Sequence, residues 1–370
     1  MKTNMSKLLF IQYKPYSGTV LNGGDQCTKR NYDMLCQVLG AENIEVLYIH
    51  DADNKRSLTS YVEGVLYMPF GYFFGLTPAR VRCIVNKAQA YDYVFIDRSV
   101  FGIIARKLKD SGYKGKIISH FHNYESAYFD AKIKKYIPFR SILLNCVKRN
   151  DRNACLYSDS VIALNQRDAE LLKNHFGKTP DTIIPISMAD QCADTQKDET
   201  FTSVPPRCLF LGSYFPANTE GIIWFMRNVA PHVRVETKIV GKGMGRLKNE
   251  CPDLLKDVEI VSDAPDLKPW FEWADMMILP IFSGSGMKVK TCESLMHGKN
   301  ILGTNEAFEG YDIHEEESGW RCNTKEEFIT CIHDFAHNPR PHYNKEARRL
   351  YLDKYSEASV LARFAKLCNR

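Results

Sequence analysis

Short apolar runs alternate with longer amphipathic runs along the first half of the chain. The amphipathic runs predict helices over about residues 28–38 and 78–87, because their apolar positions repeat at helical spacing. The apolar runs have the length of buried strands: LLFIQY, IEVLYIH, YVFID, KIISHF and SVIALN. This alternation predicts a parallel sheet that is covered by helices.

The second half repeats the alternation. Its apolar runs are RCLFLGS, ETKIVG, VEIVS, MMILPI and KNILGT, and helices are predicted over residues 221–228 and 288–296. The polar, turn-rich segment between the halves is typical of a linker. We therefore predict an α/β protein with two doubly wound domains, over 1–187 and 205–351. The linker covers 188–204, and a C-terminal helix over 352–370 packs back on the first domain.

Composition narrows the class of protein. A chain of 370 residues with 44% hydrophobic content is too long for one ordinary core. Its formal charge of +5 is weaker than a dedicated nucleic-acid binder would show, so we expect no nucleic-acid partner. Twelve cysteines form no C-x-x-C pair or metal-ligand spacing, which indicates reduced cytosolic thiols and no metal site.

The N-terminal apolar stretch is too short for a signal peptide, and we interpret it as the first strand. No run of about 18 apolar residues occurs, so we expect no membrane span. Together with the reduced thiols, these features predict a cytoplasmic protein.

The segment IFSGSGMKVKTCES suggests an anion site. It follows a buried strand, and its glycines lead into a helix that ends near Gly298. Backbone amides at a helix start favour an anion, and Lys288 and Lys290 add full charges. We expect a phosphate there, and more specifically a diphosphate.

Glu293 extends this hypothesis along the helix. Glu293 is six residues beyond Met287, a distance of about 9 Å along the helix axis. This distance suits the separation between the diphosphate and the ribose of a nucleotide. The alternative is a pair between Glu293 and Lys290 on a solvated helix face, and spacing alone leaves both open. Gly212 lies at another strand end, and Gly241, Gly243 and Gly245 indicate only a tight turn.

Several of these segments together resemble family 4 glycosyltransferases. Three segments resemble the nucleotide-sugar-binding half of the family: LFLGSYFPANTEGIIWFMRNVAP, ETKIVGKG and ADMMILPIFSGSGMKVKTCESLMHGKNILGTNEAFEG. Three others resemble the family's first half: NGGDQCTKRN, SHFHNYES and VIALNQRDAELL. The resemblance implies the GT-B fold, with two Rossmann-like domains facing a central cleft and the acceptor bound by the first. It implies a retaining, metal-independent transferase without a cofactor, of the kind used in bacterial surface polysaccharide or glycan assembly.

The implied substrates are a nucleotide-diphosphate sugar, with a UDP-sugar favoured, and a glycan or lipid-linked acceptor. Glu293 matches the second acid of the family's glutamate pair, which contacts the ribose. The first acid is absent, because Ser285 occupies its position. Many members have Gly-Arg where this chain has Gly212-Ser213, so Lys288 and Lys290 are expected to supply that charge. The predicted nucleotide-sugar contacts are Gly23, Gly24, Gly212, Ser213, Ser285, Gly286, Met287, Lys288, Val289, Lys290 and Glu293.

His122 matches the family histidine that lies near the transferred sugar, and we predict it as the catalytic residue. The alternative is that His122 or His120 only caps a strand end. Asp97 and Arg98 follow a strand and should face the cleft near the acceptor, or form a local ion pair. The candidate acceptor or cleft residues are His120, Asn123, Glu125, Asp97, Arg98 and Glu309.

Around an apolar helical stripe, residues 131–152 place Lys132, Lys134, Lys135, Arg140, Lys148 and Arg149. A domain helix with a solvated basic face is the favoured interpretation. The alternative is peripheral docking to an anionic membrane, at the inner face of the cell membrane, which would suit a lipid-linked acceptor.

Three other functions stay open. The loss of the first glutamate and of the arginine allows a non-catalytic nucleotide-sugar-binding partner of a glycan assembly complex. A nucleotide-sugar epimerase of the same architecture matches the motifs less well. A dehydrogenase is the least favoured, since no G-x-G-x-x-G follows the first strand.

Overall fold

The computed structural model describes residues 6–16, 23–50, 64–133, 139–192 and 201–368. The chain divides into two compact units. Unit 1 comprises Met1–Pro185 and Val360–Arg370, and unit 2 comprises Ile186–Ser359.

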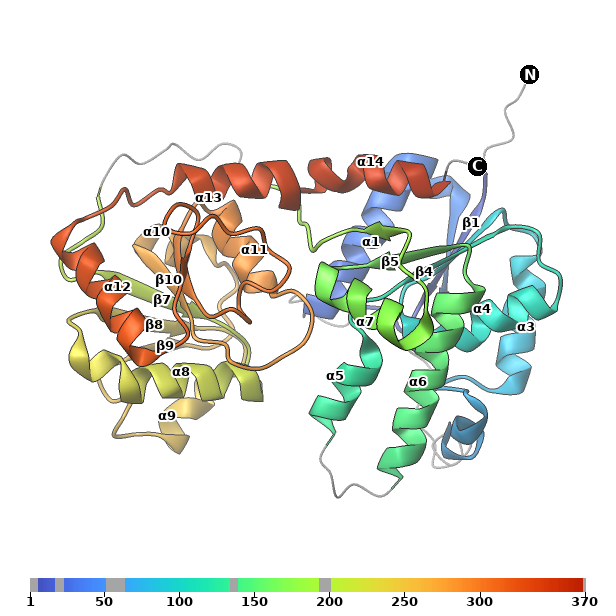
Figure 1. Cartoon of the computed structure of the whole chain (residues 1–370), viewed down its shortest axis with the longest axis horizontal. Helices are drawn as coiled ribbons and strands as arrows, with labels where there is room; N and C mark the ends of the chain where they lie inside the picture. The colour runs from blue at the N-terminus through green and yellow to red at the C-terminus, as the bar shows by residue number, and fades with distance from the viewer. Residues whose placement is uncertain (1–5, 17–22, 51–63, 134–138, 193–200, 369–370) are drawn as a thin grey trace. The chain divides into compact units, whose positions relative to one another are not determined.

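Unit 1 contains a six-stranded parallel sheet in the order β2-β1-β3-β4-β5-β6 (Figure 1). Leu8 and Phe10 of β1 pack into one core and Leu9 and Ile11 into another, because successive side chains of a strand point to opposite faces. Both faces of the sheet are therefore covered. The strands are β1 (Leu8–Gln12), β2 (Ile44–Tyr48), β3 (Tyr93–Ile96), β4 (Lys116–His120), β5 (Ser160–Ala163) and β6 (Thr182–Ile183).

Helices of unit 1 cover the two faces separately. One core is formed with α3, α4 and α6, and the other with α1 and the C-terminal helix α14 (Figure 1). Val360, Phe364 and Leu367 of α14 are buried in this second core, which confirms that the C-terminal helix packs on the first domain. The helices are α1 (Gly23–Leu39), α3 (Pro78–Ala88), α4 (Gly102–Asp110), α5 (Glu125–Lys132), α6 (Arg140–Tyr157), α7 (Gln166–Phe176) and α14 (Glu357–Cys368), with 3-10 turns at Ala41–Asn43, Met68–Phe70 and Ser99–Phe101.

Unit 2 has a second six-stranded parallel sheet, in the order β12-β11-β10-β7-β8-β9. Its strands are β7 (Arg207–Leu211), β8 (Glu236–Val240), β9 (Glu259–Val261), β10 (Met276–Leu279), β11 (Asn300–Gly303) and β12 (Trp320–Arg321). Its helices are α8 (Pro216–Asn228), α9 (Arg246–Glu250), α10 (Lys268–Trp273), α11 (Val289–Met296), α12 (Lys325–His337) and α13 (Lys345–Leu350), with a 3-10 turn at Ala230–His232 and a π-helical turn at Tyr351–Tyr355.

Each sheet has one point where the strand order reverses. In unit 1 this point lies between β1 and β3, and in unit 2 between β7 and β10. Ligands of open α/β sheets bind beyond the carboxyl ends of the strands at such a switch point. In unit 2 only Cys208 and Leu209 of β7 pair with β10, so the carboxyl ends of these two strands are not paired with each other.

Some predicted boundaries were wrong. Helix α1 begins at Gly23 and not near Thr28, so Gly23 and Gly24 form its first turn. Helix α8 begins at Pro216 and not at Gly221, because proline is favoured in the first turn of a helix. The segment 131–152 is not one helix, since α5 ends at Lys132 and α6 begins at Arg140; residues 134–138 lie outside the described residues.

Candidate functional site

The loop after β10 leads directly into the start of α11. Gly284 and Gly286 have φ of 151° and 63°, conformations that suit glycine, and the loop ends at Lys288. The Lys288 ammonium donates to the Gly286 carbonyl at 2.8 Å and to Glu306 Oε1 at 2.7 Å. Much of the charge of Lys288 is therefore balanced by Glu306, which follows β11.

Lys290 occupies the switch point itself. Its ammonium donates to Asn218 Oδ1 at 2.6 Å and lies 4.8 Å from the centroid of the Phe210 ring. A Cβ built on Gly212 would lie 2.9 Å from Lys290 Nζ, so the absence of a side chain at Gly212 makes room for the cation. Burial lowers the pKa of Lys290 to about 7, opposed by the charge of Glu293.

Glu293 lies one helical turn beyond Lys290 and is partly buried. Burial raises the pKa of its carboxyl to about 7, and Lys290 opposes this shift. The ammonium of Lys290 is bonded to Asn218 and neither side chain is on a fully solvated face, so the alternative of a solvated Lys290–Glu293 pair does not describe this helix.

Two close backbone approaches fix the loops around Lys290. A Cβ on Gly221 of α8 would lie 2.0 Å from the Pro280 carbonyl oxygen. A Cβ on Gly241, after β8, would lie 2.0 Å from the Gly212 carbonyl oxygen. Close packing of the two loops therefore explains the glycine at position 241, which the glycine spacing alone did not reveal. The loops after β7, β8 and β10 thus meet at one place.

The other predicted site residues of unit 2 lie near these loops and differ in burial and in hydrogen-bond partners. The Ser213 carbonyl accepts from Asn218 Nδ2 at 2.8 Å, and Ser285 is partly exposed in the glycine loop. Val289 is the first residue of α11 and is partly buried. The Met287 side chain is buried instead, and its sulfur accepts from the Ile186 backbone N–H at 3.4 Å. Glu309 is partly exposed, one turn beyond Glu306.

In unit 1 the switch point is occupied by Asp97, directly after β3. Its carboxylate accepts from Thr28 Oγ1 at 2.6 Å and from Asn31 Nδ2 at 2.9 Å, both on α1, and lies 3.2 Å from His122 Nε2. Burial raises the pKa of Asp97, but its attraction to the His122 ring outweighs this effect and lowers the pKa to about 2. Asp97 is thus buried against α1 and His122, while Arg98 is partly exposed.

The two histidines lie together. Strand β4 ends at His120, and the ring centroids of His120 and His122 are 4.9 Å apart. His120 is fully buried and His122 is 4% exposed, and burial lowers the pKa of both rings. Potential ligand atoms of Cys27, His120 and His122 lie within 4.8 Å of one another, which makes them the one group in the described residues that could hold a metal ion.

Acidic side chains gather beyond the histidines. Glu125 is the first residue of α5 and is buried, and burial raises its pKa to about 7, opposed chiefly by Arg98 and further by a hydrogen bond with Asn123. Asp151 of α6 accepts from Ser99 Oγ at 2.7 Å and from Ser126 Oγ at 2.6 Å. Gly23 and Gly24 open α1, and the Gly24 carbonyl accepts from Thr28 Oγ1 at 3.1 Å.

Sequence reasoning missed Asn218, Glu306, Thr28, Asn31 and Asp151 as site residues. Asn218 and Glu306 lie inside segments that carry the family resemblance, so that resemblance could have identified them. Thr28, Asn31 and Asp151 are polar residues on helices, and no local pattern distinguishes them from solvated positions.

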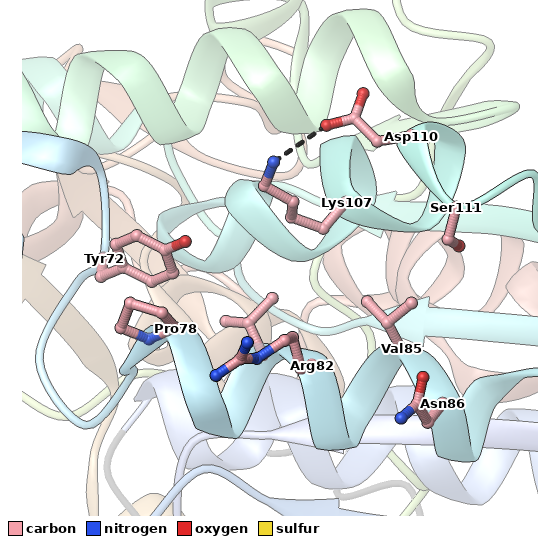
Figure 2. A pocket seen from close by; sticks show the side chains of 9 residues that line it. Tyr72, Pro78, Arg82, Val85, Asn86, Lys107, Asp110 and Ser111 are labelled. Carbon is pink, nitrogen blue, oxygen red and sulfur yellow. Dashed lines mark hydrogen bonds and ion pairs between the residues drawn. The ribbon is translucent and has the colours of Figure 1, made fainter.

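A groove of about 480 Å³ lies between α3 and α4 of unit 1 and is shown in Figure 2. Val81 and Val85 line it, and Lys107 pairs with Asp110 at 3.0 Å on its rim. None of the predicted site residues lines this groove, so it is separate from both switch points. No helix among the described residues combines the length and apolar character needed to cross a bilayer.

Comparison with known proteins finds sequence similarity in the second unit. A family model described as "Glycosyl transferases group 1" matches residues 205–338. A relative from Klebsiella pneumoniae, described as an uncharacterized 44.6 kDa protein in the cps region, is 23% identical over 271 residues. The match covers 68% of this chain and 66% of the relative, just under two thirds of its length.

Solved structures match both units. Anabaena HepE in complex with UDP-glucose is 13% identical, with a TM-score of 0.66 and 98% of each chain covered. The lipopolysaccharide outer core galactosyltransferase WaaB is 12% identical, with the same TM-score and coverage. These likenesses confirm the predicted fold class. Residues 205–338 thus match the glycosyl transferases group 1 model, and the two α/β units have the GT-B fold of the matched glycosyltransferase structures.

Proposed function

We propose that this protein is a retaining family 4 glycosyltransferase that moves a sugar from a nucleotide-diphosphate sugar to a glycan or lipid-linked acceptor. The observation that carries the proposal is the position of Lys290, a partly buried ammonium beside Gly212 at the switch point of unit 2 and in the first turn of α11. A cation and the backbone amides of a helix start, together at one strand edge, suit a diphosphate.

In this proposal each residue of unit 2 has a distinct task. Lys290 and the backbone from Gly286 to Val289 bind the diphosphate, and Glu293 accepts hydrogen bonds from the ribose hydroxyls. Cleavage of the bond to the anomeric carbon builds negative charge on the departing diphosphate, and the Lys290 ammonium stabilises it. The departing phosphate then takes the proton of the acceptor hydroxyl, so no carboxylate pair of the glycosidase type is required.

The sugar and the acceptor involve further residues. We propose that His122 lies near the transferred sugar, by the family resemblance, and that the first domain binds the acceptor. The His122 ring is buried against Asp97, so we assign it a positioning contribution through the segment after β4. The structures of HepE with UDP-glucose and with UDP support a UDP-sugar as the substrate here.

Glu306 is proposed to supply the carboxylate that is missing at Ser285. A Cβ on Gly284 would lie 3.4 Å from Glu306 Oε1, so this carboxylate lies against the glycine loop. Glu306→Gln should raise the KM for the sugar nucleotide or lower kcat by about 10-fold, while leaving binding of free UDP within about 2-fold, since the sugar hydroxyls lose a charged acceptor. Glu326→Gln, at an exposed acid in the first turn of α12, is the control. An equal loss of UDP binding would show that Glu306 acts only by holding Lys288.

The pH dependence of substrate binding follows from Lys290 and Glu293. Lys290 must be protonated to attract a diphosphate, so binding falls as pH rises above about 7. Glu293 must be ionised to accept from the ribose, so binding also falls as pH drops below about 7. Affinity for UDP-glucose, measured by calorimetry between pH 5.5 and 8.5, should peak near neutrality. Lys290→Met should remove the fall in affinity above about pH 7, and Glu293→Gln should remove the fall below about pH 7. A fall in affinity that persists in the corresponding variant would contradict the assignment.

We also propose assembly of a bacterial surface polysaccharide as the setting, supported by the cps-region relative. Cytoplasmic enzymes of this kind meet lipid-linked acceptors at the inner face of the cell membrane, and the start of α6 offers a place for peripheral contact. Phe139 is 64% exposed there, next to Arg140. Sedimentation with anionic vesicles but not with neutral vesicles, lost in Phe139→Ser, would support this contact.

The direct test of the function is transfer. Thermal unfolding in the presence of a panel of nucleotide sugars identifies the bound substrate, because binding to the folded state raises apparent stability. The identified sugar nucleotide is then incubated with extracted acceptors, and the anomeric configuration of the product is determined by NMR. A product with the opposite configuration would refute retention.

A second candidate is a non-catalytic nucleotide-sugar-binding partner in glycan assembly. Ser285, at the position of the family's sugar-contacting glutamate, favours it. Binding without hydrolysis or transfer with every extracted acceptor is the result that this candidate predicts. An isomerised sugar nucleotide as the product would instead identify an epimerase.

A further inference from the structure

Three potential metal ligands meet inside unit 1, and we call them the Cys27 cluster: Cys27, His120 and His122. Cys27 lies on α1, His120 ends β4, and His122 lies two residues further. They are 6%, 0% and 4% exposed. One potential ligand atom of each lies within 4.8 Å of those of the other two. Cys27 is remote from the histidines in sequence, so spacing could not reveal the group.

The imidazole of His120 lacks hydrogen-bond partners. Neither of its ring nitrogens has a partner among the described residues, whereas Nε2 of His122 lies 3.2 Å from Asp97. Buried polar atoms are nearly always paired, so unpaired ring nitrogens in a fully buried side chain require a reason. An ion that accepts imidazole nitrogen as a ligand would provide one.

The ligand types point to a zinc-class ion. A thiolate and two imidazoles are typical zinc ligands, and no carboxylate belongs to the group. Ligand atoms around a tetrahedral zinc lie about 3.5 Å apart, so the three side chains would close by about 1 Å. Neighbouring side chains supply contacts to the ligands themselves. Arg30 Nη2 donates to Cys27 Sγ at 3.5 Å, and the Asp97 carboxylate lies 3.2 Å from His122 Nε2.

We propose that Cys27, His120 and His122 bind one zinc-class divalent ion. On binding, the Cys27 thiol loses its proton to solvent and the sulfur–metal bond forms, with no change of oxidation state. A water molecule completes the fourth position. The ion joins α1 to the end of β4 and fixes the segment that carries His122. This inference goes beyond the proposed sugar transfer and does not rest on it, because the ion takes no part in cleaving the sugar–phosphate bond.

Cobalt titration tests the site. The full-length chain is purified without a histidine tag, stripped with a chelator, and titrated with Co²⁺ while the absorption spectrum is recorded. We expect saturation at about one ion per chain, with a thiolate-to-cobalt charge-transfer band that Zn²⁺ abolishes by competition. Asp97→Asn should weaken the affinity by about 10- to 100-fold through the loss of an outer contact to His122.

Matched variants separate the site from adventitious binding. Cys27→Ser should lose the charge-transfer band, while Cys155→Ser, another buried thiol of unit 1, should keep it. If Cys27→Ser does not fold, the wild-type chain alone decides: Zn²⁺ should raise its unfolding temperature and a chelator should reverse the rise. The absence of a band in the wild-type chain, or its persistence in Cys27→Ser, would overturn the proposal. UDP-glucose binding measured on the stripped chain reports on the proposed function separately.

Discussion

Replacing Lys290 with methionine should weaken binding of UDP-glucose by about 10- to 100-fold, the effect of losing a charged hydrogen bond. Methionine keeps the length and the apolar stem of lysine, so packing against Phe210 is preserved while the ammonium is lost. Asn218 would keep its bond from Nδ2 to the Ser213 carbonyl, which holds the loop after β7 in place. Calorimetry on the folded variant measures the loss.

Two control variants make this result specific. Lys288→Met should have a smaller effect, because the Lys288 ammonium is already paired with Glu306 at 2.7 Å. Lys325→Met, at the exposed start of α12, should leave binding unchanged. Equal losses in the Lys288 and Lys290 variants would contradict the assignment of Lys290 as the main cation of the diphosphate site.

Replacing His122 with alanine should lower kcat by about 100-fold and change the affinity for the sugar nucleotide by less than about 3-fold. The physical reason is that His122 holds the segment after β4 against Asp97. A displacement of about 1 Å in a positioning group can lower the rate of the chemical step by about 100-fold. Single-turnover kinetics and equilibrium binding separate the two quantities.

Rescue and control variants distinguish positioning from simple unfolding. His122→Asn keeps a polar group near Asp97 and should recover part of kcat. His175→Ala, an exposed histidine of α7, should leave kcat unchanged. If the His122→Ala variant unfolds at the wild-type temperature and retains full kcat, the positioning contribution is refuted.

The sequence predicted the two parallel sheets and the anion site because these depend on local patterns. Apolar periodicity in runs such as YVFID and MMILPI gave the strands of both sheets. The glycine loop before α11 was found in the same way, since a strand, a glycine loop and a helix start are consecutive in the chain. The start of α1 was missed, because Gly23 and Gly24 are residues that a helix tolerates poorly.

The tertiary structure decided which side chains act together. Lys290 and its partner Asn218 are 72 residues apart, and Asp97 and Thr28 are 69 apart. Neither pair has a local signal, because strands that are distant in sequence meet only through the order of the sheet. The same holds for Glu306 against Lys288 and for Cys27 against the two histidines. The sequence by itself thus determined the fold class and suggested an anion as the ligand, through patterns that neighbouring residues carry. Only the tertiary structure determined the partners of each charge, because those contacts form when the sheet brings remote strand ends to one edge.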